Sequence, residues 1–150
     1  MIIITLGDPL SINIEIIAKL LLEFKKILSR PVVLIGSHWQ WEDQIEKLGL
    51  PFSMPYQIIS RVPQKNLQEG LYFYNIESPH LPAEQLTLLE RGQIALQSLE
   101  TSWEFRKTLG SNSCAILTSP LQKEACYAAG MVEPGQTEFY GNREGVDSIM

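Results

Sequence analysis

Short apolar runs recur along the chain, separated by glycine, proline and small polar residues. They lie at positions 2–6, 32–35, 71–76 and 114–118. The first run is nearly continuous and rich in β-branched residues, which is typical of a central parallel strand buried on both faces. We therefore predict strands at these four positions and a further short strand in the proline-containing segment 51–70.

Between the strands, apolar residues recur at helical spacing. A helix is predicted to reach about residue 28, and either Ser11 or Asn13 could cap its N-terminus. Shorter helices are predicted at 41–48 and 122–129, and residues 131–150 are predicted to form a loop with a helical turn.

The longest predicted helix spans residues 83–109. Leu89, Leu96 and Trp103 repeat every seven residues along it, with Gly92 and Leu99 between them. Such a stripe is typical of a helix that faces a core or an interface. Strands that alternate with helices imply an α/β fold with a parallel sheet and right-handed crossovers.

Composition narrows the class of protein. The chain has 150 residues, 45% of them hydrophobic and 19% charged, which excludes wholesale disorder. Its net charge of −5, with no basic run, argues against non-specific nucleic-acid binding. No apolar stretch is long enough to span a bilayer, and Gly7 to Pro9 interrupt the N-terminal run too early for a signal peptide. We expect a cytoplasmic protein in which Cys114 and Cys126 are buried thiols.

Polar residues follow two of the predicted strands, at 5–9 and at 118–123. Ligands of open parallel sheets bind beyond the carboxyl ends of strands. Thr118, Ser119 and Lys123, with the following helix N-terminus, could therefore hold an anion such as a phosphate. A helix cap beside a solvated lysine is the simpler alternative.

A third polar cluster, PGQTE at 134–138, could line a pocket or form a surface turn. His38 and His80 are the only histidines in the sequence. A catalytic metal site usually needs three protein ligands, so both are interpreted as ordinary loop residues. The residues alone thus predict an α/β domain with a possible anion site at its strand ends.

Three sequence blocks resemble one known family. Residues 5–9 read TLGDP and are followed by Glu15 and Ile16, similar to the TLGDPAGIGPE(I/V) signature of the 4-hydroxythreonine-4-phosphate dehydrogenases, the PdxA family of vitamin B6 biosynthesis. Residues 115–125, AILTSPLQKEA, resemble the A-(I/L)-(V/I)-T-(A/G)-P-(I/V)-x-K-E-A block of that family. Residues 128–130 and 134–139 resemble its AAG and PGHTEF, and Gly145, Val146, Asp147 and Met150 match the stretch that follows. The order and spacing of the blocks agree over nearly the whole chain.

The resemblance implies an isocitrate/isopropylmalate-dehydrogenase-like α/β fold and a homodimer. It implies NAD-dependent oxidation of the C3 hydroxyl of 4-phosphohydroxy-L-threonine, followed by decarboxylation, with a divalent metal polarising the reacting oxygen. The positions that match substrate-contacting residues are Gln136 and Thr137. Thr118, Lys123 and Asp8 are the further candidates for binding the phosphorylated small-molecule substrate.

The sequence departs from the family in three places. Residues 10–15 read LSINIE where the family has AGIGPE, so two glycines and a proline are replaced. Gln136 stands where the family has a histidine, and glutamine cannot act as an acid or base at neutral pH. The family's metal-binding histidines and its cofactor site lie later in its sequence. Residues 1–150 are therefore expected to be the N-terminal portion of a PdxA-like protein that lacks the C-terminal portion. The chain alone is expected to be either a truncated enzyme or an inactive relative that at most binds phosphate or a partner.

Overall fold

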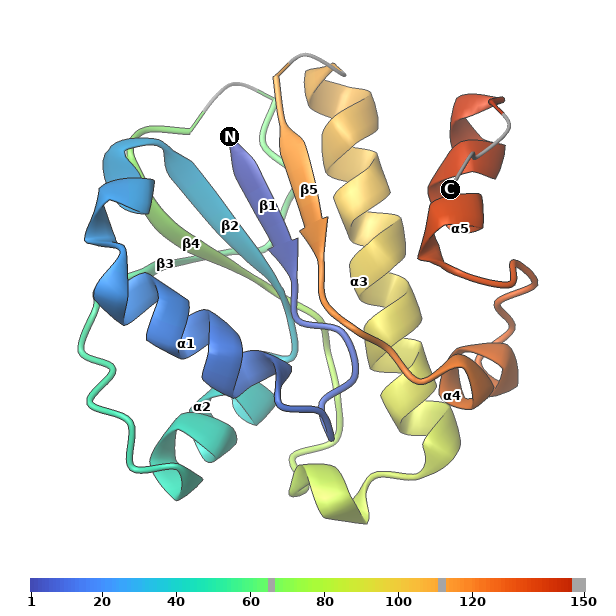
Figure 1. The fold of residues 1–150 in the computed structure, drawn as a ribbon, viewed down its shortest axis with the longest axis horizontal. Coiled ribbons are helices and arrows are strands. Elements are labelled where there is room, and N and C mark those ends of the chain that lie inside the picture. Colours follow the sequence, from blue (N-terminus) through green and yellow to red (C-terminus); the bar gives the residue numbers. More distant parts are fainter. Residues whose placement is uncertain (65–66, 111–112, 147–150) are drawn as a thin grey trace.

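A parallel β-sheet forms the centre of the molecule in the computed structural model, which describes residues 1–64, 67–110 and 113–146. Within these ranges the sheet has five strands in the order β3-β4-β2-β1-β5, and every neighbouring pair is parallel (Figure 1). Their bounds are β1 (Ile2–Thr5), β2 (Pro31–Gly36), β3 (Gln57–Ile59), β4 (Gly70–Asn75) and β5 (Ala115–Thr118). The predicted α/β fold with a parallel sheet is confirmed.

Strand β1 lies inside the sheet, between β2 and β5. Its Ile2 is in register with Val32 of β2 and with Ala115 of β5. Ile3 and Ile4 have no exposed surface, because they point to opposite faces and each face is covered. The continuous apolar run at the N-terminus is thus explained by burial on both sides.

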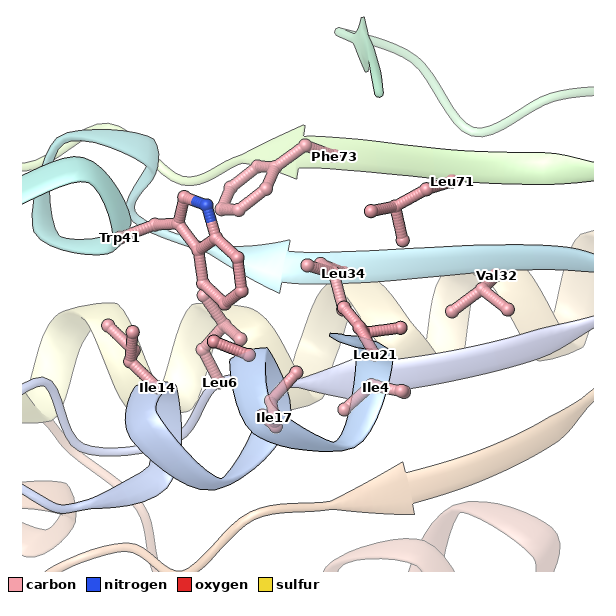
Figure 2. Close-up of a cluster of buried hydrophobic side chains, with 11 residues drawn as sticks. Ile4, Leu6, Ile14, Ile17, Leu21, Val32, Leu34, Trp41, Leu71 and Phe73 are labelled. Carbon is pink, nitrogen blue, oxygen red and sulfur yellow. The ribbon is translucent and has the colours of Figure 1, made fainter. Parts of the chain in front are cut away.

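Helices cover both faces of the sheet. Their bounds are α1 (Asn13–Glu23), α2 (His38–Lys47), α3 (Leu88–Leu109), α4 (Lys123–Ala128) and α5 (Gln136–Glu144), with 3₁₀ turns at Lys25–Ser29 and Ala83–Gln85. On one face, side chains of α1 and Trp41 of α2 pack on Ile4 and Leu34 (Figure 2). On the other face, Phe105 packs with Ile3 and Val33.

A second layer lies outside α3. Leu99 of α3 forms a separate buried cluster with Cys126 of α4 and Phe139 of α5. Both cysteines are free and buried, as predicted. Helices α4 and α5 therefore attach to the sheet mainly through α3.

The start of α1 differs from the prediction. Its N-cap is Ile12, and no side chain caps the helix, so neither Ser11 nor Asn13 has that role. Asn13 is the first helical residue instead, and its Nδ2 donates to the carbonyl oxygens of Leu6, at 3.0 Å, and Pro120, at 2.8 Å. The helix also ends at Glu23 rather than near residue 28, and the 3₁₀ turn follows.

The long helix α3 begins five residues later than predicted, at Leu88 rather than 83, because Thr87 forms a capping box with Glu90. The predicted stripe is only partly buried. Gly92 and Leu99 are buried, whereas the side chain of Leu89 is 46% exposed. The buried face of α3 is instead built around residues such as Ala95, Ser98 and Phe105.

Two smaller predictions also change. His38 is the first residue of α2, whose N-cap is Ser37, so its assignment to a loop was wrong. Residues 136–144 form the nine-residue helix α5 rather than a single turn. Asp147 and Met150, which contributed to the family resemblance, lie outside the described residues.

Candidate functional site

A cavity of about 330 Å³ lies between β5 and α5. Three of the five predicted substrate-binding residues line it: Thr118 at the end of β5, and Gln136 and Thr137 in the first turn of α5. The remaining lining residues are Arg106, Cys114, Ala115, Ile116, Tyr140 and Glu144. The structure therefore brings together side chains from two of the three sequence blocks.

The first turn of α5 is held at this position by Gln136. Its Nε2 donates to the carbonyl oxygen of Ser119, at 2.8 Å, and thus links the helix to the segment after β5. Gly135 is the N-cap in an extended conformation, and no side chain caps the helix. The N-terminal amide groups of α5 therefore begin beside the cavity, where they favour an anionic group.

The wall of the cavity contains a tyrosine and a thiol that stay protonated. Tyr140 Oη lies 2.6 Å from Ser102 Oγ, and burial raises the pKa of Tyr140 to about 12. Burial also raises the pKa of the Cys114 thiol above its ordinary value. Neither group is ionised near neutral pH, so both contribute hydrogen bonding or apolar contact rather than charge.

Two charged side chains line the cavity, and they form an ion pair with each other. Arg106, near the end of α3, donates through Nε to Glu144 Oε1, near the end of α5. Together with two threonine hydroxyls and one amide, this guanidinium gives the cavity donors suited to phosphate, carboxylate or hydroxyl groups. The cavity is therefore equipped to bind an anionic or hydroxylated ligand.

Asp8 lies in a different cluster. Its carboxylate accepts hydrogen bonds from the Leu10 backbone N–H at 2.9 Å and from Arg91 Nε at 3.0 Å. Arg91 also donates through Nη2 to Gln122 Oε1, at 2.6 Å. Asp8 is only 5% exposed, and its ion pair with Arg91 ties the loop after β1 to α3.

This loop passes close to the segment after β5. Gly7 has a φ of +68°, and a Cβ at this position would lie 2.4 Å from the Pro120 carbonyl oxygen. Only glycine fits such a conformation and such an approach. The fold therefore requires glycine at this position of the TLGDP block for steric reasons.

Lys123 does not line the cavity. It is the first residue of α4, and its side chain is exposed. Sequence reasoning missed Arg91 and Gln122, which bind at the Asp8 cluster, and Arg106 and Tyr140, which line the cavity. Gln122 lies within the 115–125 block but was not singled out, and the other three belong to no recognised motif. Their partners are remote in sequence, 31 and 83 positions away for Arg91 and 38 positions away for Arg106 and Tyr140.

A second polar cavity of about 330 Å³ lies at the carboxyl ends of β2 and β4. His38 Nε2 lies 2.8 Å from Tyr56 Oη, and the Trp39 ring stacks on His80 with centroids 5.9 Å apart. Acidic side chains, among them Glu42 and Glu46, complete its wall. No predicted site residue lies there, so the cavity between β5 and α5 is the better candidate.

The described residues contain no group of three or more histidine, cysteine or acidic residues that could hold a metal ion. The donors at hand therefore do not fit the divalent metal that the family resemblance implies. Across the described ranges, no helix has the length and apolar character needed to cross a membrane.

Comparison with known proteins confirms the predicted resemblance. The chain is 31% identical over 141 residues to D-threonate 4-phosphate dehydrogenase of Salmonella typhimurium, an alignment that covers 91% of this chain and 41% of the relative. It is 28% identical over 148 residues to 4-hydroxythreonine-4-phosphate dehydrogenase of Beijerinckia indica, covering 97% of this chain and 42% of the relative. No protein-family model matches the chain.

Solved structures show the same similarity. A 4-hydroxythreonine-4-phosphate dehydrogenase from Burkholderia phymatum superposes with a TM-score of 0.77 at 27% identity, over 97% of this chain and 44% of that one. A structure described as a putative enzyme of the same name from Salmonella typhimurium gives a TM-score of 0.74 at 27% identity, over 95% of this chain and 44% of that one. The chain thus spans less than half the length of the relatives that it matches, while sharing their fold over nearly all of its own length.

Proposed function

We propose that the chain is the substrate-binding part of an oxidoreductase similar to the 4-hydroxythreonine-4-phosphate dehydrogenases, and that the cavity between β5 and α5 holds the phosphorylated substrate. The meeting of Thr118, Gln136 and Thr137 in that cavity carries the proposal. The relatives' names specify two substrates, 4-hydroxythreonine 4-phosphate and D-threonate 4-phosphate. Both are four-carbon acids with a terminal phosphate, and they differ at C2, where one bears an amine and the other a hydroxyl.

The chemistry of the cavity suits the groups that these two acids share. The hydroxyls of Thr118 and Thr137 can donate to phosphate or carboxylate oxygens, and the N-terminal amides of α5 favour the anion. Gln136 is neutral at any ordinary pH, so it positions the substrate by hydrogen bonding and transfers no proton. Lys123 and Asp8 remain proposed substrate contacts although both lie outside this cavity, so each would meet only a part of the substrate that extends beyond it, and Asp8 would have to share its carboxylate with Arg91.

In the proposed complete enzyme, NAD would supply the acceptor for the hydride from C3, and the proposal includes a homodimer and a place in vitamin B6 synthesis. The described residues do not fit a divalent metal, so no step through a metal is assigned to them. We infer that the chain by itself binds substrate without turnover. It would then act as a binding module, which is the second function class that the sequence left open.

Calorimetry with each of the two phosphorylated acids tests the proposed binding. Thr137→Val and Thr118→Val should each weaken binding by about tenfold, because each removes one hydrogen bond to an anion. Thr108→Val is the matched control, since Thr108 is exposed on α3 and does not line the cavity. Binding that is unchanged in both cavity variants would contradict the proposed site.

Turnover is tested separately by NADH formation with either acid, NAD and Mg²⁺ or Mn²⁺. No turnover is expected from the 150-residue chain. Gln136→His should not restore it, since one imidazole supplies neither a metal site nor a cofactor site. Activity of the chain or of this variant would show that the portion shared with the relatives is sufficient for catalysis.

A further inference from the structure

The segment between β5 and α4, residues 119–122, forms neither strand nor helix, and two side-chain amides hold its first two carbonyl groups. Gln136 Nε2 of α5 donates to the carbonyl oxygen of Ser119, at 2.8 Å. Asn13 Nδ2 of α1 donates to the carbonyl oxygen of Pro120, also at 2.8 Å. In Figure 1 this segment passes between α1 and α5. We call these two hydrogen bonds the amide clamp.

The side chain of Asn13 is fully engaged. It is only 2% exposed, and its Nδ2 also donates to the carbonyl oxygen of Leu6, at 3.0 Å. Its Oδ1 accepts from Ser11 Oγ, at 3.1 Å. Gly7 leaves the room that this amide needs, since a Cβ at position 7 would lie 2.8 Å from Asn13 Nδ2. A buried amide whose nitrogen and oxygen are both bonded keeps one orientation, so it can fix the position of Pro120.

Backbone groups support the clamp from the side of β1. The Asp8 N–H donates to the carbonyl oxygen of Pro120, at 3.3 Å. The Ser119 N–H donates to Thr5 Oγ1, at 3.4 Å, and Thr5 has no exposed surface. These bonds are longer than those of the two amides. The amides are therefore the shorter of the links that join the segment to α1 and α5.

The clamp adjoins the candidate site without lying wholly inside it. Thr118 immediately precedes Ser119, and Thr137 immediately follows Gln136, so each cavity threonine is one residue from a clamped group. Asn13 is not among the residues that line the cavity. Any effect of Asn13 on a ligand must therefore pass through Pro120 and its neighbours.

We propose that Asn13 and Gln136 are positioning residues, which fix Thr118 and the first turn of α5 relative to each other before a ligand arrives. The identity of the ligand rests on the proposed function, whereas the clamp is a property of the ligand-free chain. A preformed cavity spares the ligand the cost of ordering its wall. If the binding-competent arrangement is only partly populated, the apparent Kd rises in inverse proportion to its population.

Both clamp residues are departures from the family pattern, which has glycine at position 13 and histidine at position 136. Neither glycine nor histidine carries a carboxamide. The alternative is that Gln136 acts only by touching the ligand. In that case Asn13 would have no influence on binding, so Asn13 is the residue that separates the two explanations.

Calorimetry with the two phosphorylated acids tests the positioning. Asn13→Ala should weaken binding about fivefold, as expected if the competent population falls to about a fifth. In a Thr118→Val background the same substitution should weaken binding by less than about twofold, because the group that it positions is gone. Ile14→Val is the matched control: Ile14 is the next residue of α1, is 2% exposed and packs on the sheet. It should lower the unfolding temperature and leave the Kd unchanged.

Amide exchange in the ligand-free chain tests the clamp without any ligand. Asn13→Ala should speed exchange of the Phe139 N–H, which donates to Gly135 in the first turn of α5, by about threefold or more. Gln136→Met keeps the length of the side chain but has no donor, and should speed exchange of the Asp8 N–H by a similar factor. Amides of β2 are the internal reference and should not change by more than they do in Ile14→Val.

Two binding results would overturn the proposal: a Kd of Asn13→Ala equal to that of Ile14→Val, or equal losses in the parent and Thr118→Val backgrounds. If the parent chain binds neither acid, the proposed function fails at this cavity and amide exchange decides the positioning alone. Exchange that is unchanged at both Phe139 and Asp8 then refutes it. If Asn13→Ala does not fold, Gln136→Met decides through the Asp8 amide, since Gln136 is only half-buried.

Discussion

Arg91 connects three segments that are remote in sequence. Its guanidinium donates to Asp8, 83 positions away, and to Gln122, 31 positions away. Both members of the ion pair are largely withdrawn from solvent, with side chains 14% and 6% exposed. Removing one partner of such a pair leaves the other charge buried and unpaired, which costs more than the pair itself contributes.

Arg91→Met should therefore lower the free energy of unfolding by about 3 kcal/mol, measured by urea denaturation. Arg61→Met, at an exposed position, is the control and should change it by less than about 0.5 kcal/mol. The double variant Arg91→Met/Asp8→Asn should regain part of the lost free energy of unfolding, since it no longer contains the unpaired carboxylate. Equal stability of the two arginine variants would show that Asp8 is solvated in solution.

At the scale of elements, the contact between α3 and α4 depends on one small residue. A Cβ on Gly92 would lie 1.8 Å from the carbonyl oxygen of Ala125, which is backbone and cannot rotate away. The two helices can approach this closely only because position 92 has no side chain.

Gly92→Ala should consequently destabilise the protein by about 2 kcal/mol, even though alanine is the better helix former, because the clash outweighs a propensity gain of about 1 kcal/mol. Gln93→Ala, on the exposed side of the same turn, should be neutral or slightly stabilising. Thermal unfolding of both variants provides the measurement. A stabilised Gly92→Ala variant would mean that α4 does not pack on α3 as described.

Elements were predictable where a single local pattern determines them. Continuous apolar runs located β1, β2, β4 and β5 within about one residue, because these runs are rich in the β-branched, aliphatic and aromatic residues that favour strands. Helix ends were less predictable. Asn13 resembles an N-cap in sequence, but its amide is engaged with carbonyl groups of Leu6 and Pro120, and the latter partner is 107 positions away.

The candidate site, too, was predictable only in part. The family blocks pointed to Gln136, Thr137 and Thr118, and the fold places all three at one cavity. The blocks could not reveal that Asp8 is paired with Arg91, because Arg91 lies 83 positions away on α3, a helix that belongs to no motif. Long-range pairing of charges is invisible to local patterns.

On the scale of the whole molecule, the sheet and its two flanking clusters form one unit, and α4 and α5 form a layer attached through α3. Arg143 of α5 joins this layer internally. It donates to Glu133 Oε1 at 2.8 Å, and its guanidinium lies 3.5 Å from the centre of the Phe139 ring. Because this layer contains an ion pair that needs an ionised carboxylate, lowering the pH should destabilise it before it destabilises the sheet.

Burial raises the pKa of Glu133, but hydrogen bonds from backbone N–H groups and from Arg143 outweigh it, so the pKa lies below the ordinary value of 4.5. A carboxyl group with a lowered pKa in the folded state stabilises it above its unfolded pKa, and this contribution is lost as pH falls through the folded value. As the pH is lowered below 4.5, the amides of residues 136–144 should therefore lose protection from exchange at a higher pH than the amides of β1 and β2. Glu133→Gln should remove this difference in pH dependence, and an unchanged profile in that variant would exclude Glu133 as the cause.

The position of β1 also determines the order in which the chain can fold. The terminal amine of Met1, the residue before β1, donates to the carbonyl oxygen of Ser113, 112 positions away, while β2, the other neighbour of β1, begins at Pro31. Closing the short connection costs less entropy than closing the long one, and contacts between distant segments slow folding. Pairing of β1 with β2 should precede docking of β5, so that during synthesis the three isoleucines of β1 stay paired on one side only until most of the chain has left the ribosome.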